Sequence, residues 1–285
     1  DGVDYRLTLS ISPTLAAMLA DPLLQERYLR RLDKIIELAE LETIRTRWIP
    51  EQNACAWHYL GRFRDCRRRY EETYGHNLLA AFDRFGRTGR LELLTCNATH
   101  AFLPLLQHQT PVVRAQIAIG LAEFRRHFGR PSPGLWSAEC GYYPGLDILL
   151  AAAGVRYFFL DAHGLLLGTR PPALGAWAPV RCPSGVAAFG REVETARQVW
   201  NAKVGYPGDP LYREFYRDIG FDLEYGYVTP FIHESGLRTA TGLKYHRVTG
   251  PVGLGDKLPY DPRAAAQRAR EHAAHFVAQR HEQVR

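Results

Sequence analysis

Hydrophobic and polar positions follow two different periods along the chain of 285 residues. Short runs that alternate or are wholly apolar predict strands, and apolar residues three and four apart predict amphipathic helices. Strands are expected at residues 5–10, 91–95, 135–139 and 155–160. Helices are expected at residues 13–19, 23–41, 54–85, 111–128, 145–153 and 261–285.

The order of these elements repeats a strand, a polar residue at the strand's end, and a helix. This order is typical of an α/β barrel or a doubly wound sheet. Parallel strands place their carboxyl ends on one face, so we expect His100, Glu139 and Asp161 to converge there. After Gly164 the chain becomes rich in turn formers and aromatic residues, which predicts long ordered loops that shape a substrate site.

Composition agrees with an ordinary globular protein, because 46% of the residues are hydrophobic and 23% are charged. The five cysteines form an odd set without a C-x-x-C pair. This usage argues against a disulfide framework or a zinc ribbon and favours a reducing cytoplasm. No apolar run approaches the roughly 18 to 20 residues that span a bilayer, so we expect no membrane partner.

The charge balance suggests a nucleic-acid partner only weakly. There are 36 basic and 30 acidic residues, which gives a net charge of +6. The basic residues cluster at 26–31 and 62–69, where acidic and apolar residues interrupt them at helical spacing. Such spacing indicates a solvated helix face, and we expect no nucleic-acid partner.

Glu139 is the strongest candidate for chemistry. It lies at the end of a predicted strand, close in sequence to Trp136, Tyr142 and Tyr143. A carboxylate among aromatic side chains is suited to act as a glycosidase nucleophile or acid beside an aromatic surface that stacks on a sugar. An equally weighted alternative is structural, a glutamate that caps the next helix or pairs with an arginine. The Glu-His-Ala-Ala-His run at 271–275 has neither the order nor the spacing of a zinc motif, so we interpret it as helix surface.

Three stretches together resemble a known family. They are residues 91–104 (LELLTCNATHAFLP), 134–147 (GLWSAECGYYPGLD) and 198–219 (QVWNAKVGYPGDPLYREFYRDI). In this order they resemble glycoside hydrolase family 57, especially its 1,4-α-glucan branching enzymes, and the likeness covers nearly the whole chain. The resemblance implies an incomplete (β/α)7 barrel that acts on α-1,4-glucan by a retaining double displacement. It implies transfer of the cleaved chain to a 6-hydroxyl, in glycogen biosynthesis, without a metal or organic cofactor.

The resemblance also implies roles for particular residues. Glu139, in the W-x-x-E-C-G-Y motif, matches the nucleophile, and His100 matches an active-site ligand. Arg191 and Gly208 match substrate contacts, and Asp161 matches an aspartate with a supporting role. Expected sugar-stacking surfaces are Trp136, Trp177 and Trp200.

Two family motifs are absent, an opening H-A-H-L-P-Y type strand and the D-A-E-L-F-G-H-W-W type segment with the general acid. Retaining chemistry needs two carboxyl groups about 5 to 5.5 Å apart. The expectation is therefore a partial catalytic domain over residues 1–285 that carries the nucleophile and lacks the acid. Within it we expect a helical insertion at about 23–85 and a substrate-loop region at about 164–258.

A third departure concerns the acceptor of the glucan chain. Branching enzymes of the family resemble one another in a mobile loop with a tyrosine at its tip, where this chain has Leu174 in the segment 170–177. A loop without this tyrosine would exclude water from the glycosyl-enzyme intermediate less well, which would raise the ratio of hydrolysis to branching. The alternatives are an α-amylase or 4-α-glucanotransferase of the same family, or a glucan-binding remnant without catalysis. The sequence does not set the oligomeric state.

Overall fold

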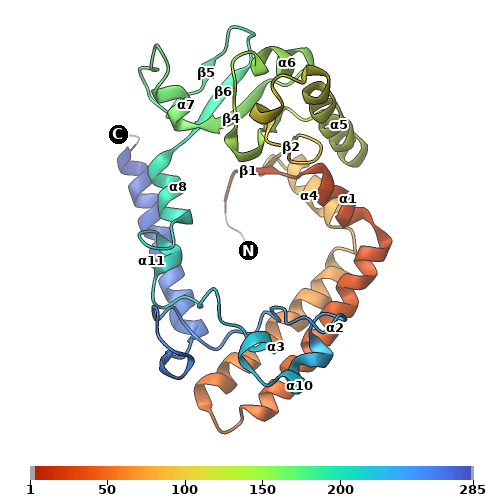
Figure 1. Cartoon of the computed structure of the whole chain (residues 1–285), viewed down its shortest axis with the longest axis vertical. Helices are drawn as coiled ribbons and strands as arrows, with labels where there is room; N and C mark the ends of the chain where they lie inside the picture. The colour runs from red at the N-terminus through yellow and green to blue at the C-terminus, as the bar shows by residue number, and fades with distance from the viewer. Residues whose placement is uncertain (1–3, 284–285) are drawn as a thin grey trace. The chain divides into compact units, whose positions relative to one another are not determined.

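The computed structural model of the protein describes residues 4–283 (Figure 1). The chain divides into two compact units. The first comprises Asp1–Gln25 and Tyr74–Glu194, and the second comprises Glu26–Thr73 and Thr195–Arg285. Each unit has its own hydrophobic core. The organisation of residues 1–285 as one partial barrel domain stays a prediction.

The first unit is built on a mostly parallel sheet. Its described strands are β1 (Leu7–Ser10), β2 (Leu91–Cys96), β3 (Gly134–Trp136), β4 (Tyr157–Asp161), β5 (Val180–Arg181) and β6 (Ala187–Arg191). They lie in the order β1-β2-β3-β4-β6-β5, and among them only β5 runs antiparallel to its neighbour. This confirms the α/β class. An open sheet with β1 and β5 at its edges agrees with part of an incomplete (β/α)7 barrel.

Helices connect and cover these parallel strands, as parallel pairing requires. They are α1 (Pro13–Ala20), α4 (Leu78–Arg87), α5 (Thr110–Phe128), α6 (Leu146–Ala152) and α7 (Ala162–Leu166). The residues that α5 buries recur three and four apart, at Val113, Ile117, Phe124 and Phe128. Gly120 lies on the same helix, where an added Cβ would come within 2.3 Å of the Cys96 carbonyl oxygen. Glycine therefore allows α5 to approach the end of β2 closely.

The second unit is mainly helical. It contains most of α2 (Pro22–Arg45) and α8 (Val193–Trp200), with α3 (Pro50–Arg68), a π-helix (Arg69–Thr73), α9 (Ile219–Asp222), α10 (Tyr225–Val228) and α11 (Pro262–Gln283). Its core is formed by α2, α3 and the segment that follows α8, and includes Leu38, Tyr59, Leu60, Ile219 and Leu243. Short 3₁₀ helices lie at Leu103–Leu106, Ala138–Cys140, Tyr206–Gly208, Thr229–Phe231 and Leu254–Asp256.

Two predicted elements are wrong in their extent. The single helix at 54–85 is interrupted after the π-helix, because Gly75 and His76 have φ angles of 54° and 62°, which an α-helix does not accommodate. Asn77 then begins α4, where its side chain accepts a hydrogen bond from the Ala80 amide at 2.9 Å. The strand predicted to end at Glu139 ends at Trp136, and Glu139 lies in the turn that follows.

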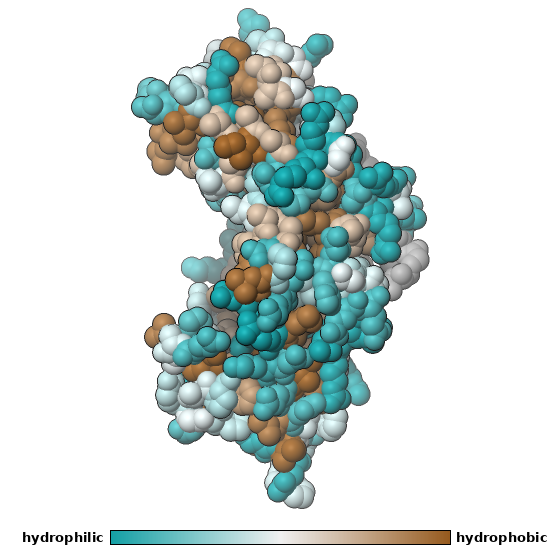
Figure 2. All heavy atoms as spheres, turned by 90° about the vertical axis from the view of Figure 1, so that its right-hand side faces the viewer, coloured by the Kyte–Doolittle hydropathy of each residue, from teal (hydrophilic) through white to brown (hydrophobic). Residues whose placement is uncertain are grey.

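The basic segment 62–69 forms the solvated helix face that its spacing predicts. Arg64 pairs with Glu40 at 2.5 Å, Arg67 with Asp33 at 2.7 Å, and Asp65 accepts from Arg68 and Arg69. Hydrophilic residues prevail on the face drawn in Figure 2, where hydrophobic residues form separate patches. None of the described helices combines the length and apolar character needed to cross a membrane.

Candidate active site

The turn after β3 presents Glu139 in a strained backbone. Glu139 and the next residue, Cys140, have φ angles of 53° and 54°, a region that costs a non-glycine residue of order 1 kcal/mol. The fully buried Ser137 holds the turn, since its hydroxyl donates to the Gly141 carbonyl oxygen at 2.6 Å. The Cys140 amide donates to the Ser137 carbonyl oxygen at 2.9 Å. The result is a glutamate side chain that is 78% exposed.

His100 lies in a loop at the end of β2 that is fixed from two sides. Its φ is 55°, and its amide donates to the carbonyl oxygen of the fully buried Asn97 at 3.2 Å. The Asn97 side chain donates to the Ala101 carbonyl oxygen, and the Gln116 side chain on α5 accepts from the Thr99 amide at 3.0 Å. The close approach of α5 to β2 therefore also positions the histidine.

These two loops bring His100 and Glu139 together. The Nε2 atom of His100 lies 3.8 Å from Oε1 of Glu139, beyond hydrogen-bond distance. Gly141 makes the approach possible, because a Cβ there would come within 2.5 Å of the Phe102 ring. Among residues 4–283 no arginine pairs with Glu139, and α6 begins after Gly145 without a side-chain cap. The described structure thus gives Glu139 neither of the structural roles considered for it.

Asp161 and Arg191 form a second pair at the ends of β4 and β6. They are register partners, and the Arg191 guanidinium lies 3.1 Å from the Asp161 carboxylate. Burial raises the pKa of the nearby Cys140 thiol; Arg191 opposes this shift, while Asp161 and Glu139 add to it. Because all three charges act on one thiol, both pairs lie around Cys140. Because β2, β3 and β4 are parallel neighbours, His100, Glu139 and Asp161 lie at the same edge of the sheet, as predicted.

The predicted tryptophans of the first unit differ in their surroundings. Trp136 is half-buried in a row of aromatic rings along the sheet, with its ring centroid 5.7 Å from that of Phe159. Trp177 is exposed in the loop before β5, close in sequence to the exposed Leu174. Trp136 thus packs against a neighbouring ring and keeps part of its surface exposed, whereas Trp177 presents more of its ring to solvent.

Trp200 and Gly208 belong to the second unit. Trp200 is exposed at the end of α8. An added Cβ at Gly208 would lie 2.2 Å from the Ala202 carbonyl oxygen, so close packing of the backbone requires this glycine. Whether Gly208 also contacts substrate stays a prediction.

Residues 271–275 lie on the surface of α11, as interpreted from the sequence, and their two histidines also make contacts that the sequence did not predict. The His272 ring is tilted against that of Tyr206, with centroids 4.5 Å apart, and its Nδ1 lies 2.9 Å from the Tyr212 hydroxyl. Nδ1 of His275 lies 2.7 Å from the Tyr206 hydroxyl. These histidines attach α11 to the turn that carries Gly208.

Sequence reasoning missed the residues that hold the site. They are Asn97, Ser137, Cys140 and Gly141. The serine before a turn was a usable signal, because its hydroxyl readily bonds the nearby backbone. Within residues 4–283, no three His, Cys, Asp or Glu side chains form a group that could hold a metal ion.

Known proteins resemble the chain over most of its length. It is 29% identical to a 1,4-alpha-glucan branching enzyme of Thermococcus kodakarensis, over 97% of this chain and 42% of that protein. The crystal structure of the alpha-amylase AmyC from Thermotoga maritima matches with a TM-score of 0.93 and 45% identity, over 98% of this chain and 54% of the other. The crystal structure of a GH57-type branching enzyme from Pyrococcus horikoshii matches with a TM-score of 0.82 and 32% identity, over 98% of this chain and 50% of the other.

The chain spans about half the length of these relatives or less. Residues 4–276 match the sequence profile of glycosyl hydrolase family 57. Because this match covers nearly the whole sequence, the chain belongs to glycosyl hydrolase family 57.

Proposed function

We propose that the protein acts on α-1,4-glucan by a retaining double displacement in which Glu139 is the nucleophile. The observation that carries this proposal is an exposed carboxylate on a strained turn at the end of a parallel strand, beside His100 and without an arginine partner among residues 4–283. Glu139 attacks the anomeric carbon, and the bond to the departing chain's oxygen breaks. An acceptor hydroxyl then attacks the glycosyl ester and gives its proton to the second carboxyl group, which protonated the departing oxygen, and the Glu139 carboxylate is released.

The second pair of the site would position the sugar. One oxygen of Asp161 is occupied by Arg191, which fits a supporting role. Arg191 is half-exposed, and a guanidinium has five N–H donors, so donors remain for sugar hydroxyls. His100 would bind a hydroxyl beside the reacting carbon, while Trp136, Trp177, Trp200 and Gly208 are proposed to contact the rest of the chain.

The departing oxygen needs a proton from a second carboxyl group. We propose that this general acid lies outside these 285 residues, as the absent acid motif implies. The relatives are about twice as long, so they have room for it. The activity is accordingly proposed for the whole protein that contains this chain.

Branching is the proposed outcome, with a 6-hydroxyl as acceptor, in glycogen biosynthesis in the cytoplasm. Its support is the likeness to branching enzymes at 29% and 32% identity. Two observations favour a second candidate, an α-amylase. They are the 45% identity to AmyC and the exposed Leu174 where the resemblance places a tyrosine.

Product linkage separates these candidates. The full-length protein is incubated with amylose, and new α-1,6 linkages are measured by proton NMR alongside reducing ends. Branching predicts α-1,6 signals with few new reducing ends, and hydrolysis predicts the reverse.

The role of Glu139 is tested in the same assay. Glu139→Gln should abolish both products, while the matched variant Glu37→Gln, at an exposed position of α2, should retain both. Glucan binding by the unsubstituted protein without any turnover would contradict the catalytic proposal and favour the binding remnant.

A further inference from the structure

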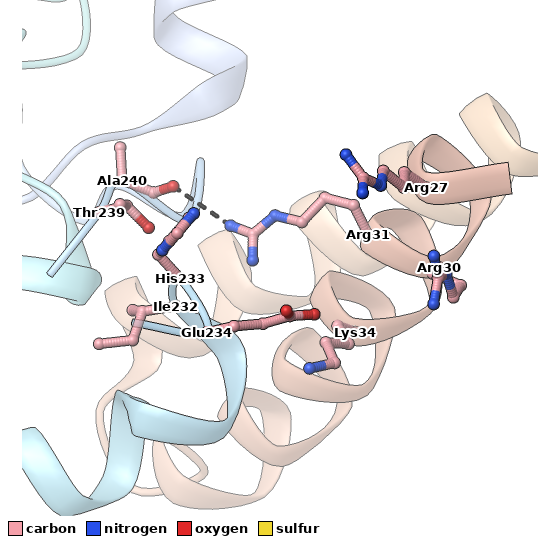
Figure 3. A pocket seen from close by; sticks show the side chains of 9 residues that line it. All are labelled: Arg27, Arg30, Arg31, Lys34, Ile232, His233, Glu234, Thr239 and Ala240. Atoms are coloured by element: carbon pink, nitrogen blue, oxygen red, sulfur yellow. Dashed lines mark hydrogen bonds between the residues drawn. The ribbon is translucent and has the colours of Figure 1, made fainter. Parts of the chain in front are cut away.

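The two basic segments of the sequence have different surroundings in the structure. Acidic side chains pair with Arg64, Arg67, Arg68 and Arg69, whereas the segment 26–31 contributes to a pocket of about 840 Å³ in the second unit (Figure 3). Arg27, Arg30, Arg31 and Lys34 line one side, three and four residues apart on one face of α2. The other side is lined by Ile232, His233, Glu234, Thr239 and Ala240.

Positive charge in this pocket exceeds negative charge. Arg30 lies 3.7 Å from Glu26 on the exposed helix surface, and such a pair contributes little. Within residues 4–283, Arg27 and Lys34 have no ion-pair partner, and Glu234 is the one acidic residue among those that line the pocket. Apart from Arg30, which lies near Glu26, three cations and one carboxylate therefore line the pocket.

Arg31 is held in place by neutral partners. Its guanidinium donates to the Ala240 carbonyl oxygen at 3.2 Å and to the Phe231 carbonyl oxygen, as Figure 3 shows for Ala240. Burial lowers the pKa of Arg31, and the charge of Asp218 opposes this shift. A half-buried cation that lacks a contacting carboxylate favours an anion beside it. Three of its five N–H donors remain available.

The loop opposite α2 adds neutral hydrogen-bonding groups. Nδ1 of His233 accepts from the Ser235 amide at 3.2 Å, so Nε2 carries the hydrogen of the neutral ring and can donate. Thr239 adds a hydroxyl, and Glu234 adds an acceptor. No aromatic residue other than this histidine is among the described residues that line the pocket, so it lacks the platform of a sugar-stacking site.

We propose that this pocket binds a phosphorylated sugar, with its phosphate on Arg27, Arg31 and Lys34 and its hydroxyls on Glu234 and Thr239. A phosphomonoester carries nearly two negative charges and three acceptor oxygens, which suit a group of arginines and a lysine. The pocket has room for more than a phosphate ion. Glu234 repels a second phosphate and accepts a hydrogen bond from a hydroxyl. This proposal does not depend on the chemistry of Glu139.

Calorimetric titration of this chain tests the proposal with glucose 6-phosphate, inorganic phosphate and glucose as probes. Glucose 6-phosphate should bind saturably at one site and more tightly than inorganic phosphate, and glucose should not bind this pocket. The double variant Arg27→Ala/Lys34→Ala should weaken binding at least tenfold. The matched double variant Arg263→Ala/Arg270→Ala removes the same charge from exposed positions of α11 and should change it less than twofold.

Three results would overturn the proposal. The first is a lack of binding of glucose 6-phosphate at millimolar concentration. The second is an equal loss in both double variants, which would show a general attraction of anions to a basic protein. The third is equal affinity for inorganic phosphate, which would remove the sugar from the assignment. Thermal unfolding of both variants establishes that each is folded.

Discussion

Two glutamates, one in each unit, show opposite ways of placing a carboxylate. Glu42 on α2 is fully buried and accepts hydrogen bonds from the hydroxyls of Tyr227 at 2.7 Å and Tyr245 at 2.6 Å, and two from Arg45. Glu139 is 78% exposed, and within residues 4–283 the one ionisable side chain recorded as its partner is His100, at 3.8 Å. The first carboxylate has its acceptor sites filled by the protein, and the second leaves its oxygens free.

The comparison teaches that burial and hydrogen bonding distinguish a structural carboxylate from a reactive one. A buried charge is tolerated only when it is paired, so Glu42 fixes the packing of α2 against the segment that holds Tyr227 and Tyr245. Glu139 instead projects into solvent from a strained backbone. Backbone strain of this kind is found mostly at functional sites.

Removal of the buried carboxylate should have the largest effect on stability. Glu42→Ala leaves Arg45 and two tyrosine hydroxyls without their partner, so we expect the free energy of unfolding to fall by about 3–5 kcal/mol. Urea denaturation measures it. Glu139→Ala should stay within about 0.5 kcal/mol of the unsubstituted chain. Equal losses for both would remove the distinction between the two glutamates.

Removal of single donors to Glu42 should have a smaller effect. Tyr245→Phe takes one hydroxyl from the buried carboxylate, and we expect a loss of about 1.5–3 kcal/mol in unfolding free energy. Tyr227→Phe should cost less, because Tyr227 is only half-buried. The same denaturation measurement ranks the two, and a larger loss at Tyr227 would contradict this view of the cluster.

A methyl group at Gly141 should disturb the loop that carries His100. Gly141→Ala places its Cβ 2.5 Å from the Phe102 ring, and we expect a loss of about 1–3 kcal/mol in unfolding free energy. Gly61→Ala is the matched control. Gly61 lies inside α3 with no atom within 4 Å of an added Cβ, so alanine should stabilise by about 0.5–1 kcal/mol. Equal signs for the two substitutions would refute the packing argument.

Lowering the pH should destabilise the second unit modestly through His246. Burial lowers the pKa of His246, and Asp222 opposes this shift. In the unfolded chain the pKa of this histidine is about 6.5, so below that pH the unfolded chain binds a proton that the folded chain binds less readily. The free energy of unfolding therefore falls as the pH falls. The melting temperature from pH 7.5 to 5.5 should depend less on pH in His246→Gln than in the exposed control His281→Gln. Identical pH dependence in both variants would exclude His246.

The sequence predicted elements better than contacts. Parallel strands with intervening helices were predictable because hydrophobic periodicity follows directly from burial on a sheet. The strained φ of Glu139 was not, since it depends on the buried Ser137 and on packing of Gly141 against Phe102. The first of these contacts lies within a turn that has no hydrophobic periodicity, and the second joins two segments that are distant in the sequence.

Pairings across the sheet were hidden for a similar reason. Asp161 faces Arg191 because β6, rather than β5, is the neighbour of β4, and β5 lies outside it in antiparallel orientation. Strand order of this kind leaves no periodic signal in the sequence. The contacts of His272 and His275 were missed because the spacing of the two histidines was compared only with that of a zinc motif.

The most direct test of the central claim is to trap the glycosyl ester on Glu139. α-Maltotriosyl fluoride is a suitable donor for the full-length protein, because fluoride departs without a general acid. Rapid denaturation and peptide mass spectrometry should find the maltotriosyl group on Glu139. In Glu139→Gln the adduct should be absent, and fluoride release should fall more than about a thousandfold. An adduct on another carboxylate, or unchanged fluoride release from Glu139→Gln, would contradict the assignment of the nucleophile.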